Sequence, residues 1–446
     1  MSRTALLVVL AGATALVAPH QARAATANEI ALEARLERLE AEMAALQGEL
    51  ASARAEGTAR LAALESKPPA EGLRDGNTTI RIGGYLKLLA TQSAFSEGEV
   101  ANNALGRDFY LPQQIPVGTG PSSRVQDFTA KQTRLWLNFA SDVAGHAVRG
   151  YLETDFQAAA GTQGTQRTTN AYNLALRRAF LQIDRWTFGE DWTTFQYTGA
   201  LPESTDYIGA TEGTVFVRQP LIRYSAPLSK AVTLHLALEN PESGTISAGT
   251  GTMVENGKDH MPDLAARLVW SEGRAELSLG LLARQVRTES AAGISATAGG
   301  YGASLGGRLF LNGKKSADLR FMATYGRNIG RYVGLNFAPD AVYVAASNRL
   351  EHVDVLAALA ALRVPLAARL RLNLIGSYQS VAYADGLAPA AISGMNKRAF
   401  SGAVNLFYSP VNNIDLGLEY RHGEREVVSG ASGALDRIEF AAKYNF

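Results

Sequence analysis

The feature that most constrains the fold of this chain is an alternation of apolar and polar residues that recurs from Thr79 to the C-terminus. In residues 232–239, for example, Val or Leu occupies every second position, and Thr, His, Ala and Glu lie between them. Successive side chains of a β-strand point to opposite faces, so the pattern predicts strands with one apolar and one polar face. A water-soluble β-sandwich alternates in the same way. The alternation by itself therefore predicts only an all-β fold.

The links between these strands indicate the architecture. Sixteen alternating segments can be placed, centred near Ile80, Leu135, Val148, Leu181, Trp186, Ile222, Leu234, Leu268, Leu279, Leu305, Phe321, Val355, Leu372, Leu406, Leu416 and Phe440. Short and long links alternate between them, and Asn312-Gly313 in one short link is typical of a tight hairpin. The segment near Trp186 is very short, which leaves fourteen or eighteen strands as alternatives. The alanine-rich residues 350–364 read almost as well as a helix.

Sixteen antiparallel strands with short turns at one end and long polar links at the other are typical of an outer-membrane β-barrel. After Thr79 no run of about 18 apolar residues occurs, so helical membrane spans are excluded. A closed barrel also pairs every backbone polar group, as lipid requires. The last strand places Ile438, Phe440, Tyr444 and the terminal Phe446 on one face. Such an aromatic terminus resembles the signal by which barrel-insertion machinery recognises its clients, so outer-membrane lipid and that machinery are the expected partners.

The first 24 residues predict export. Arg3 precedes an apolar run from Ala5 to Val17 that is too short to span a bilayer, and Ala22-Arg23-Ala24 matches a cleavage signature. We expect a signal peptide over residues 1–24, whose removal leaves 41 basic and 42 acidic residues from the original 43 and 42. This near neutrality argues against nucleic acid as a partner. The absence of cysteine excludes a disulfide framework and thiolate metal sites.

Residues 25–67 carry a heptad pattern. Its apolar positions are Leu32, Leu36, Leu39, Met43, Leu46 and Leu50. A seam that repeats every 3.5 residues is buried by packing against another helix, so we expect a periplasmic coiled coil that joins copies of the chain. Lys67-Pro68-Pro69 ends the helix. Residues 68–78 are then a linker and 79–446 the barrel; a single solvated amphipathic helix is the alternative to the coiled coil.

Several blocks of the chain resemble the DcaP-like outer-membrane porins. They are Arg218–Ser225, Leu238–Ser243, Met261–Leu268, Leu416–Gly423 and, in the first strand after the heptads, Gly84-Tyr85-Leu86-Lys87. The resemblance covers nearly the whole mature chain. It implies a trimeric porin of sixteen strands that passes small anionic solutes such as dicarboxylates. The blocks carry no motif from which individual pore contacts follow.

The inward faces of the strands are expected to decide what such a channel passes. Residues opposite the apolar stripes include fourteen bases: Arg81, Lys87, Arg134, Arg149, Arg178, Arg223, Arg267, Arg308, Arg320, Arg369, Arg371, Arg421, Arg437 and Lys443. They also include nine acids: Glu153, Asp155, Asp184, Glu239, Asp263, Asp318, Asp415, Glu419 and Glu439. A net positive lumen attracts anions, and guanidinium groups bind carboxylates through two parallel hydrogen bonds. Arg369 and Arg371 are expected to form one rung of an arginine track; the alternative is that the inward charges only pair with one another.

The link from Gly189 to Gly213 is predicted to fold inward and narrow the pore. It contains no Lys or Arg, and its acids are Glu190, Asp191, Glu203, Asp206 and Glu212. An acidic loop opposite a basic wall creates a transverse field and also weakens anion preference. The alternative for Glu203 and Asp206 is that they hydrogen-bond within their own loop and are structural.

The sequence thus predicts a diffusion channel for small anionic solutes and no enzyme. Gly302-Ala303-Ser304-Leu305-Gly306 matches a nucleophile elbow, but it lies in an alternating strand and not at a strand-to-helix turn. The six histidines show no metal-ligand spacing and no phosphate-binding loop is present, so no cofactor or metal is expected. The alternative function is a tether whose coiled coil links the outer membrane to periplasmic components with little transport. The long links and the inward loop favour the channel, because a tether needs neither.

Overall fold

The structure is a computed structural model that describes residues 72–446, apart from 158–168, 170, 252, 256 and 291–292, and isolated residues between 34 and 48. The chain divides into two units, Met1–Glu71 and Gly72–Phe446. In the first unit the described residues are helical and exposed, Leu39 and Met43 among them. The predicted signal peptide, most of the predicted coiled coil and the start of the predicted linker lie outside the described residues. Within the described part, no helix is long and apolar enough to cross a membrane.

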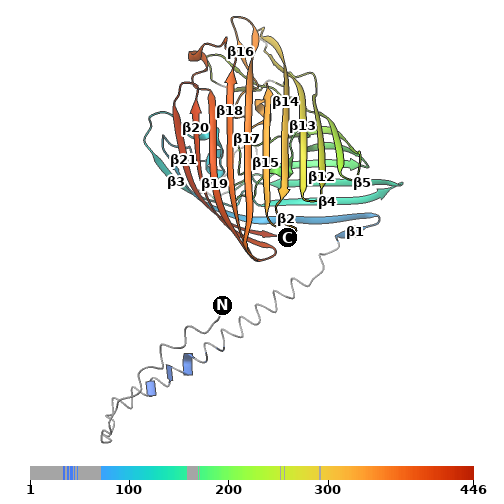
Figure 1. The fold of residues 1–446 in the computed structure, drawn as a ribbon, viewed down its shortest axis with the longest axis vertical. Helices are drawn as coiled ribbons and strands as arrows, with labels where there is room; N and C mark the ends of the chain where they lie inside the picture. Colours follow the sequence, from blue (N-terminus) through green and yellow to red (C-terminus); the bar gives the residue numbers. More distant parts are fainter. Residues whose placement is uncertain are drawn as a thin grey trace. The chain divides into compact units, whose positions relative to one another are not determined.

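The regular elements of the second unit are almost all strands (Figure 1). They are β1 (Leu73–Asp75), β2 (Thr78–Phe95), β3 (Ser123–Thr129), β4 (Arg134–Val143), β5 (His146–Asp155), β6 (Ala175–Ile183), β7 (Trp186–Trp192), β8 (Arg218–Pro227), β9 (Val232–Glu239), β10 (Gly244–Ser247), β11 (Met253–Glu255), β12 (Asp263–Glu272), β13 (Ala275–Glu289), β14 (Ser295–Phe310), β15 (Asp318–Arg327), β16 (Ala341–Val344), β17 (Arg349–Ala367), β18 (Leu370–Tyr383), β19 (Asn396–Val411), β20 (Ile414–Val427) and β21 (Ser432–Asn445). Short helices lie in the links: α2 (Leu105–Asp108), η1 (Pro112–Gln114), η2 (Thr198–Ala200), η3 (Gly330–Tyr332) and η4 (Pro389–Ile392).

Sixteen strand positions form a closed antiparallel barrel. β2, β5 to β9, β12 to β15 and β17 to β21 take one position each. β3 and β4 share the remaining position, because β4 pairs with the first half of β2 and β3 with the second half. β2 and β21 close the ring in a register from Tyr85↔Asn445 to Phe95↔Leu435, which backbone bonds between Gly84 and Phe446 extend. The predicted sixteen-stranded barrel is confirmed.

The two faces of each strand differ as the alternation predicts. In β19, Phe400, Val404 and Leu406 are exposed on the outer face, whereas Ser401 and Asn405 are buried on the inner face. The inner residues are buried because the long links fold into the barrel and pack against them. Apolar side chains of these links and of the wall form one large core cluster inside the barrel.

The strand predicted near Val355 is confirmed, since residues 350–364 belong to the 19-residue strand β17. Three other local expectations differ from the structure. The predicted linker contains β1, which pairs with the start of β2. The predicted tight hairpin at Asn312-Gly313 is wrong: Asn312 Oδ1 accepts a bond from Ser316 N at 3.0 Å, and the positive φ lies at Lys315. Two links predicted to be long are short, because β13, β14, β20 and β21 continue beyond the expected strand ends.

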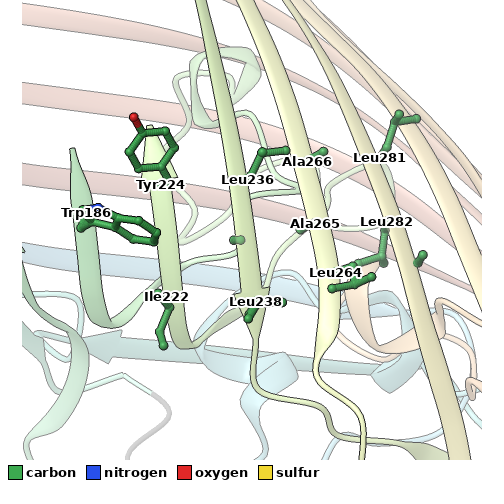
Figure 2. A pocket seen from close by; sticks show the side chains of 12 residues that line it. Trp186, Ile222, Tyr224, Leu236, Leu238, Leu264, Ala265, Ala266, Leu281 and Leu282 are labelled. Carbon is green, nitrogen blue, oxygen red and sulfur yellow. The ribbon is translucent and has the colours of Figure 1, made fainter. Parts of the chain in front are cut away.

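One wall of the barrel is built of short strands. β7, β8, β9 and β12 have 7, 10, 8 and 10 residues, whereas β17 to β21 have 14 to 19. The outer face of this wall carries an apolar groove of about 650 Å³ (Figure 2). It is lined on the outside by Trp186, Ile222, Tyr224, Leu236, Leu238, Leu264 and Leu281.

Candidate functional site

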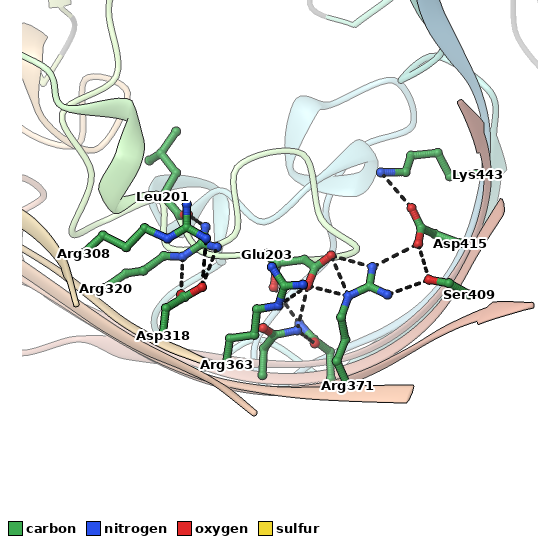
Figure 3. Close-up of polar contacts among 12 residues, drawn as sticks. Leu201, Glu203, Arg308, Asp318, Arg320, Arg363, Arg371, Ser409, Asp415 and Lys443 are labelled. Carbon is green, nitrogen blue, oxygen red and sulfur yellow. Dashed lines mark hydrogen bonds and ion pairs between the residues drawn. The ribbon is translucent and has the colours of Figure 1, made fainter. Parts of the chain in front are cut away.

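The link between β7 and β8, residues 193–217, lies inside the barrel and follows its inner wall. Successive strands hold it through wall-to-loop bonds: Arg267 to Gln196 O, Glu276 to Tyr197 Oη, Arg320 to Leu201 O, Arg371 to Glu203, Glu439 to Thr205 Oγ1 and Lys87 to Thr205 O. The loop thus runs from β12 past β15, β18 and β21 to β2, and Figure 3 shows part of this path. The loop is thus fastened to the inner wall at many points along its length.

Buried carboxylates of the wall anchor the tip of this loop. Glu419 on β20 accepts bonds from Ser204 Oγ at 2.7 Å and Thr205 N at 3.0 Å. Glu439 on β21 accepts a bond from Thr205 Oγ1 at 2.9 Å. Both acids, and Arg421 beside Glu419, are fully enclosed. Glu419 and Glu439 therefore hold the loop, and neither they nor Arg421 are exposed to the lumen.

Glu203 is clamped by arginines at the short-turn end of the wall (Figure 3). Arg371 donates to it from Nε at 2.8 Å and from Nη2 at 2.6 Å, and Arg363 Nε lies 3.8 Å away. Asp415 accepts a further bond from Arg371 at 3.0 Å. Burial raises the pKa of Glu203, but the bonds and charge of Arg371 outweigh it and hold the pKa below its usual value.

The other two acids of the loop are buried within it. Asp206 accepts bonds from the backbone N–H groups of Tyr110, Ile208 and Gly209 at 2.7, 3.1 and 3.0 Å. Glu212 contacts the Tyr110 hydroxyl at 3.3 Å, and burial raises the pKa of Glu212. Asp206 is therefore structural, which was the alternative weighed from the sequence.

The loop is less acidic toward the lumen than expected. Glu190 and Asp191 lie on β7 and not on the loop. Asp206 and Glu212 are enclosed, so Glu203 is the loop acid that remains accessible. The transverse field was predicted from five acids. A single accessible carboxylate, Glu203, remains to generate it, and that carboxylate is paired with Arg371.

The wall of β4 to β8 carries a cluster of arginines around three acids. Arg134 lies 3.1 Å from Asp155, and Asp191 binds Arg178 at 2.6 Å and Arg223 at 2.9 Å. Arg223 also donates to Thr194 Oγ1 of the loop at 2.8 Å.

The alternation of residues along β6 did not predict that Arg177 faces the inside of the barrel. Its guanidinium binds Glu153 at 2.7 Å and Asp155 at 2.8 Å. The register between β5 and β6 shifts at this point, so Arg177 occupies a β-bulge and faces inward next to Arg178. A bulge interrupts the alternation of inward and outward side chains, and no sequence motif marks its position. The adjacent Arg177 and Arg178 were the only indication of it.

In three ion pairs of the wall, the cation is more exposed than its carboxylate. The Arg308 side chain is 23% exposed and its partner Asp318 0%, at 2.9 Å. Arg178 is 22% exposed and Asp191 7%. Arg320 shares Asp318 at 2.6 Å. The carboxylates are thus covered by the guanidinium groups that pair with them.

Other predicted residues lie away from the constriction. Arg81 and Arg149 are exposed near the short-turn ends of β2 and β5. Arg369 lies in the turn between β17 and β18, is exposed and bonds to Pro410 O, so the rung expected from Arg369 and Arg371 does not form. Asp184 lies in the turn after β6, 2.8 Å from His146, and not in the lumen.

The nucleophile-like Ser304 lies within β14, and its hydroxyl is 2.8 Å from Thr324 Oγ1 on β15. It is therefore a cross-strand contact in the sheet. Among the described residues, no group of three or more His, Asp or Glu side chains could hold a metal ion.

The model of the DcaP outer membrane protein family matches residues 111–446. The chain belongs to this family. The predicted resemblance is confirmed. The barrel resides in the outer membrane.

Solved structures share the barrel fold of this chain. The outer membrane channel DcaP of Acinetobacter baumannii is 25% identical over 84% of this chain and 100% of that one, with a TM-score of 0.69. OmpT of Vibrio cholerae (12% identity, 84% and 100% coverage, TM-score 0.51) and the anion-selective porin from Comamonas acidovorans (11%, 83% and 100%, 0.50) share the fold. No curated protein matches the chain.

Proposed function

We propose that the barrel is a diffusion channel for small anionic solutes, dicarboxylates among them. The observation that supports this most directly is the geometry of the lumen ion pairs. The guanidinium groups of Arg178, Arg308 and Arg320 are accessible, while Asp191 and Asp318 are covered by them. A solute therefore meets positive charge although the pairs are nearly neutral in sum.

This arrangement favours anions for two physical reasons. A lumen with low-dielectric walls focuses the field of its accessible charges and raises the local concentration of counter-ions. Guanidinium also offers several N–H donors in a plane that matches a carboxylate. The one accessible loop acid, Glu203, is neutralised by Arg371, so it opposes anions less than five acids would.

The decisive experiment is planar-bilayer conductance of the purified protein, with the reversal potential measured in a KCl gradient. We expect open channels and a reversal potential that is shifted toward the equilibrium potential of chloride. Absence of conductance would overturn the channel and favour the tether, in which the N-terminal segment joins the membrane to periplasmic components. A reversal potential on the potassium side would overturn the anion preference alone.

We further infer that the protein forms a homotrimer, joined through the wall of short strands. A tilted strand needs roughly 9 to 11 residues to cross the hydrocarbon layer, and β7 and β9 have 7 and 8. The apolar groove on this wall, around Trp186 and Leu236, offers a surface that another copy can cover (Figure 2). The periplasmic coiled coil over residues 25–67 would add a second contact between copies, and the exposed terminal Phe446 would engage the insertion machinery.

A further inference from the structure

Arg363 lies on the inner face of β17, beside the inward loop. Every second residue of β17 from Val355 to Ala361 is buried in the core cluster inside the barrel. Arg363 continues this series, and it lies opposite the inward residues Asp318 of β15 and Asn373 of β18. The sequence did not place it there, because the alternation is weak along the alanine-rich part of this strand. Figure 3 shows its side chain next to Glu203 of the loop.

The guanidinium of Arg363 takes part in no hydrogen bond with the described residues. Its ion contact is with Glu203, whose carboxylate lies 3.8 Å from Nε, too far for a hydrogen bond. Nε is the only one of its three nitrogens that is buried without a partner, so Nη1 and Nη2 are exposed. The side chain is 29% exposed, compared with 15% for Arg371 and 13% for Arg320. Two nitrogens of Arg363 are therefore open on the inner side of the wall.

The carboxylates beside Arg363 are engaged by other arginines. Arg371 donates to Glu203 Oε1 at 2.6 Å and to Glu203 Oε2 at 2.8 Å. Asp318 accepts a bond from Arg320 at 2.6 Å, and its side chain is fully buried. Either acid could approach Arg363 only by giving up a short, charge-assisted bond.

The neighbouring arginines do not have such free donors. Arg320 uses all three guanidinium nitrogens in bonds to Asp318 and Leu201 O. Arg371 uses its three nitrogens in bonds to Glu203, Ser409 and Asp415. A solute carboxylate can therefore bind Nη1 and Nη2 of Arg363 through two parallel hydrogen bonds without breaking a bond of the wall. At Arg320 or Arg371 the same contact would compete with an existing bond.

We infer that Arg363 binds a carboxylate of the passing solute and is a specificity-determining residue of the channel. Nη1 and Nη2 donate to the two carboxylate oxygens on the wall beside the inward loop. The contact needs one carboxylate only, so it serves every solute of the proposed class, dicarboxylates included. The inference rests on the proposed channel function and adds to it a saturable binding step at a named residue.

The test uses the full-length protein in planar bilayers, with succinate as the probe. Succinate is expected to reduce the KCl current of the wild type saturably. Arg363→Gln should raise the half-blocking concentration of succinate about ten-fold, as expected for loss of a charge-assisted contact. Arg369→Gln removes an arginine from the exposed turn between β17 and β18, and this matched control should leave the block unchanged.

Arg363→Lys separates a bound carboxylate from a general effect of charge. Lysine keeps the positive charge but lacks the planar pair of donors. The reversal potential in KCl should therefore stay at the wild-type value, while the half-blocking concentration of succinate rises. Since Arg363 makes no hydrogen bond with the described residues, both variants should fold, and the heat-dependent mobility of the barrel in electrophoresis checks this. If Arg363→Gln fails to fold, Arg363→Lys carries the comparison.

Three results would overturn the inference: block by succinate that does not saturate, wild-type block in a folded Arg363→Gln, or wild-type block in Arg363→Lys. The last would show that positive charge suffices and that no paired hydrogen bonds form. The reversal potential of the wild type in KCl reports on the proposed function separately. Retained chloride preference with unchanged succinate block in Arg363→Gln would therefore reject the role of Arg363 and leave the channel intact.

Discussion

Arg371 on β18 binds Glu203 of the inward loop through two of its nitrogens, at 2.8 and 2.6 Å. The same guanidinium is accessible from the lumen and also binds Asp415 at 3.0 Å. One residue thus fixes the position of the loop and neutralises the one accessible acid on it. The position of the loop and the charge that the lumen presents are consequently linked at this contact.

Glu203→Gln should increase the preference for chloride and loosen the loop. The variant removes the accessible carboxylate that Arg371 and Arg363 share, and Asp415 remains as the acid paired with Arg371. Loss of the charge-assisted pair should weaken the anchoring of the loop by about 1.5–3 kcal/mol. Reversal potential and single-channel noise measure the two effects. Glu272→Gln, an exposed acid at the end of β12, is the control, and equal behaviour of the two variants would contradict the prediction.

Arg308→Gln combined with Arg320→Gln should shift selectivity toward cations. Both arginines cover Asp318, at 2.9 and 2.6 Å, so their removal exposes an unpaired acid to the lumen. The reversal potential in a KCl gradient should move by several millivolts toward potassium. Arg369→Gln removes an arginine from an exposed turn and should leave the reversal potential unchanged. If the double variant also leaves it unchanged, these arginines do not face the pathway.

Acidification should release the loop at Glu203. Its pKa in the folded protein is lower than the ordinary value of 4.5. The contact with Arg371 therefore stabilises the loop above that ordinary value and is lost as the pH falls through the lower, folded-state pKa. Glu212, with its raised pKa, contributes in the opposite sense, since its stabilisation is present at low pH and fades as pH rises.

We accordingly expect conductance and noise to be constant near neutral pH and to rise below about pH 4.5. Recordings across this range measure the effect. In Glu203→Gln the transition should disappear, because the variant cannot titrate at this position. A transition that persists in the variant would assign it to other groups.

Leu236→Gln combined with Leu264→Gln should dissociate the proposed trimer while the barrel stays folded. Both side chains are about half exposed on the outer face of the short-strand wall and line the apolar groove. Leu406→Gln combined with Leu418→Gln makes the same change on the outer face of β19 and β20, where we expect lipid. Native electrophoresis and crosslinking in detergent measure the oligomer. Dissociation by the second pair and not by the first would place the interface on the other wall.

Much of the fold followed from local sequence. The alternation along β19 or β9 expresses the two faces of a strand, and each face is a property of neighbouring residues. The strands and links could then be counted, because turns separate the alternating segments. Arg308, Arg320 and Arg371 could be placed on the inner face for the same reason. Where regular alternation failed, so did the prediction, as at the bulge of Arg177 and the turn around Lys315.

The chemistry of the candidate site could not be read in this way. Asp206 and Glu203 are three residues apart in one acidic loop, yet Asp206 is enclosed by backbone N–H groups and Glu203 is accessible beside Arg371. That difference depends on Tyr110 and Arg371, which are far away in the chain. The sequence by itself determined a barrel and the two faces of its strands. Only the tertiary structure decided which of these charges a solute can reach, because burial and pairing arise from contacts between distant segments.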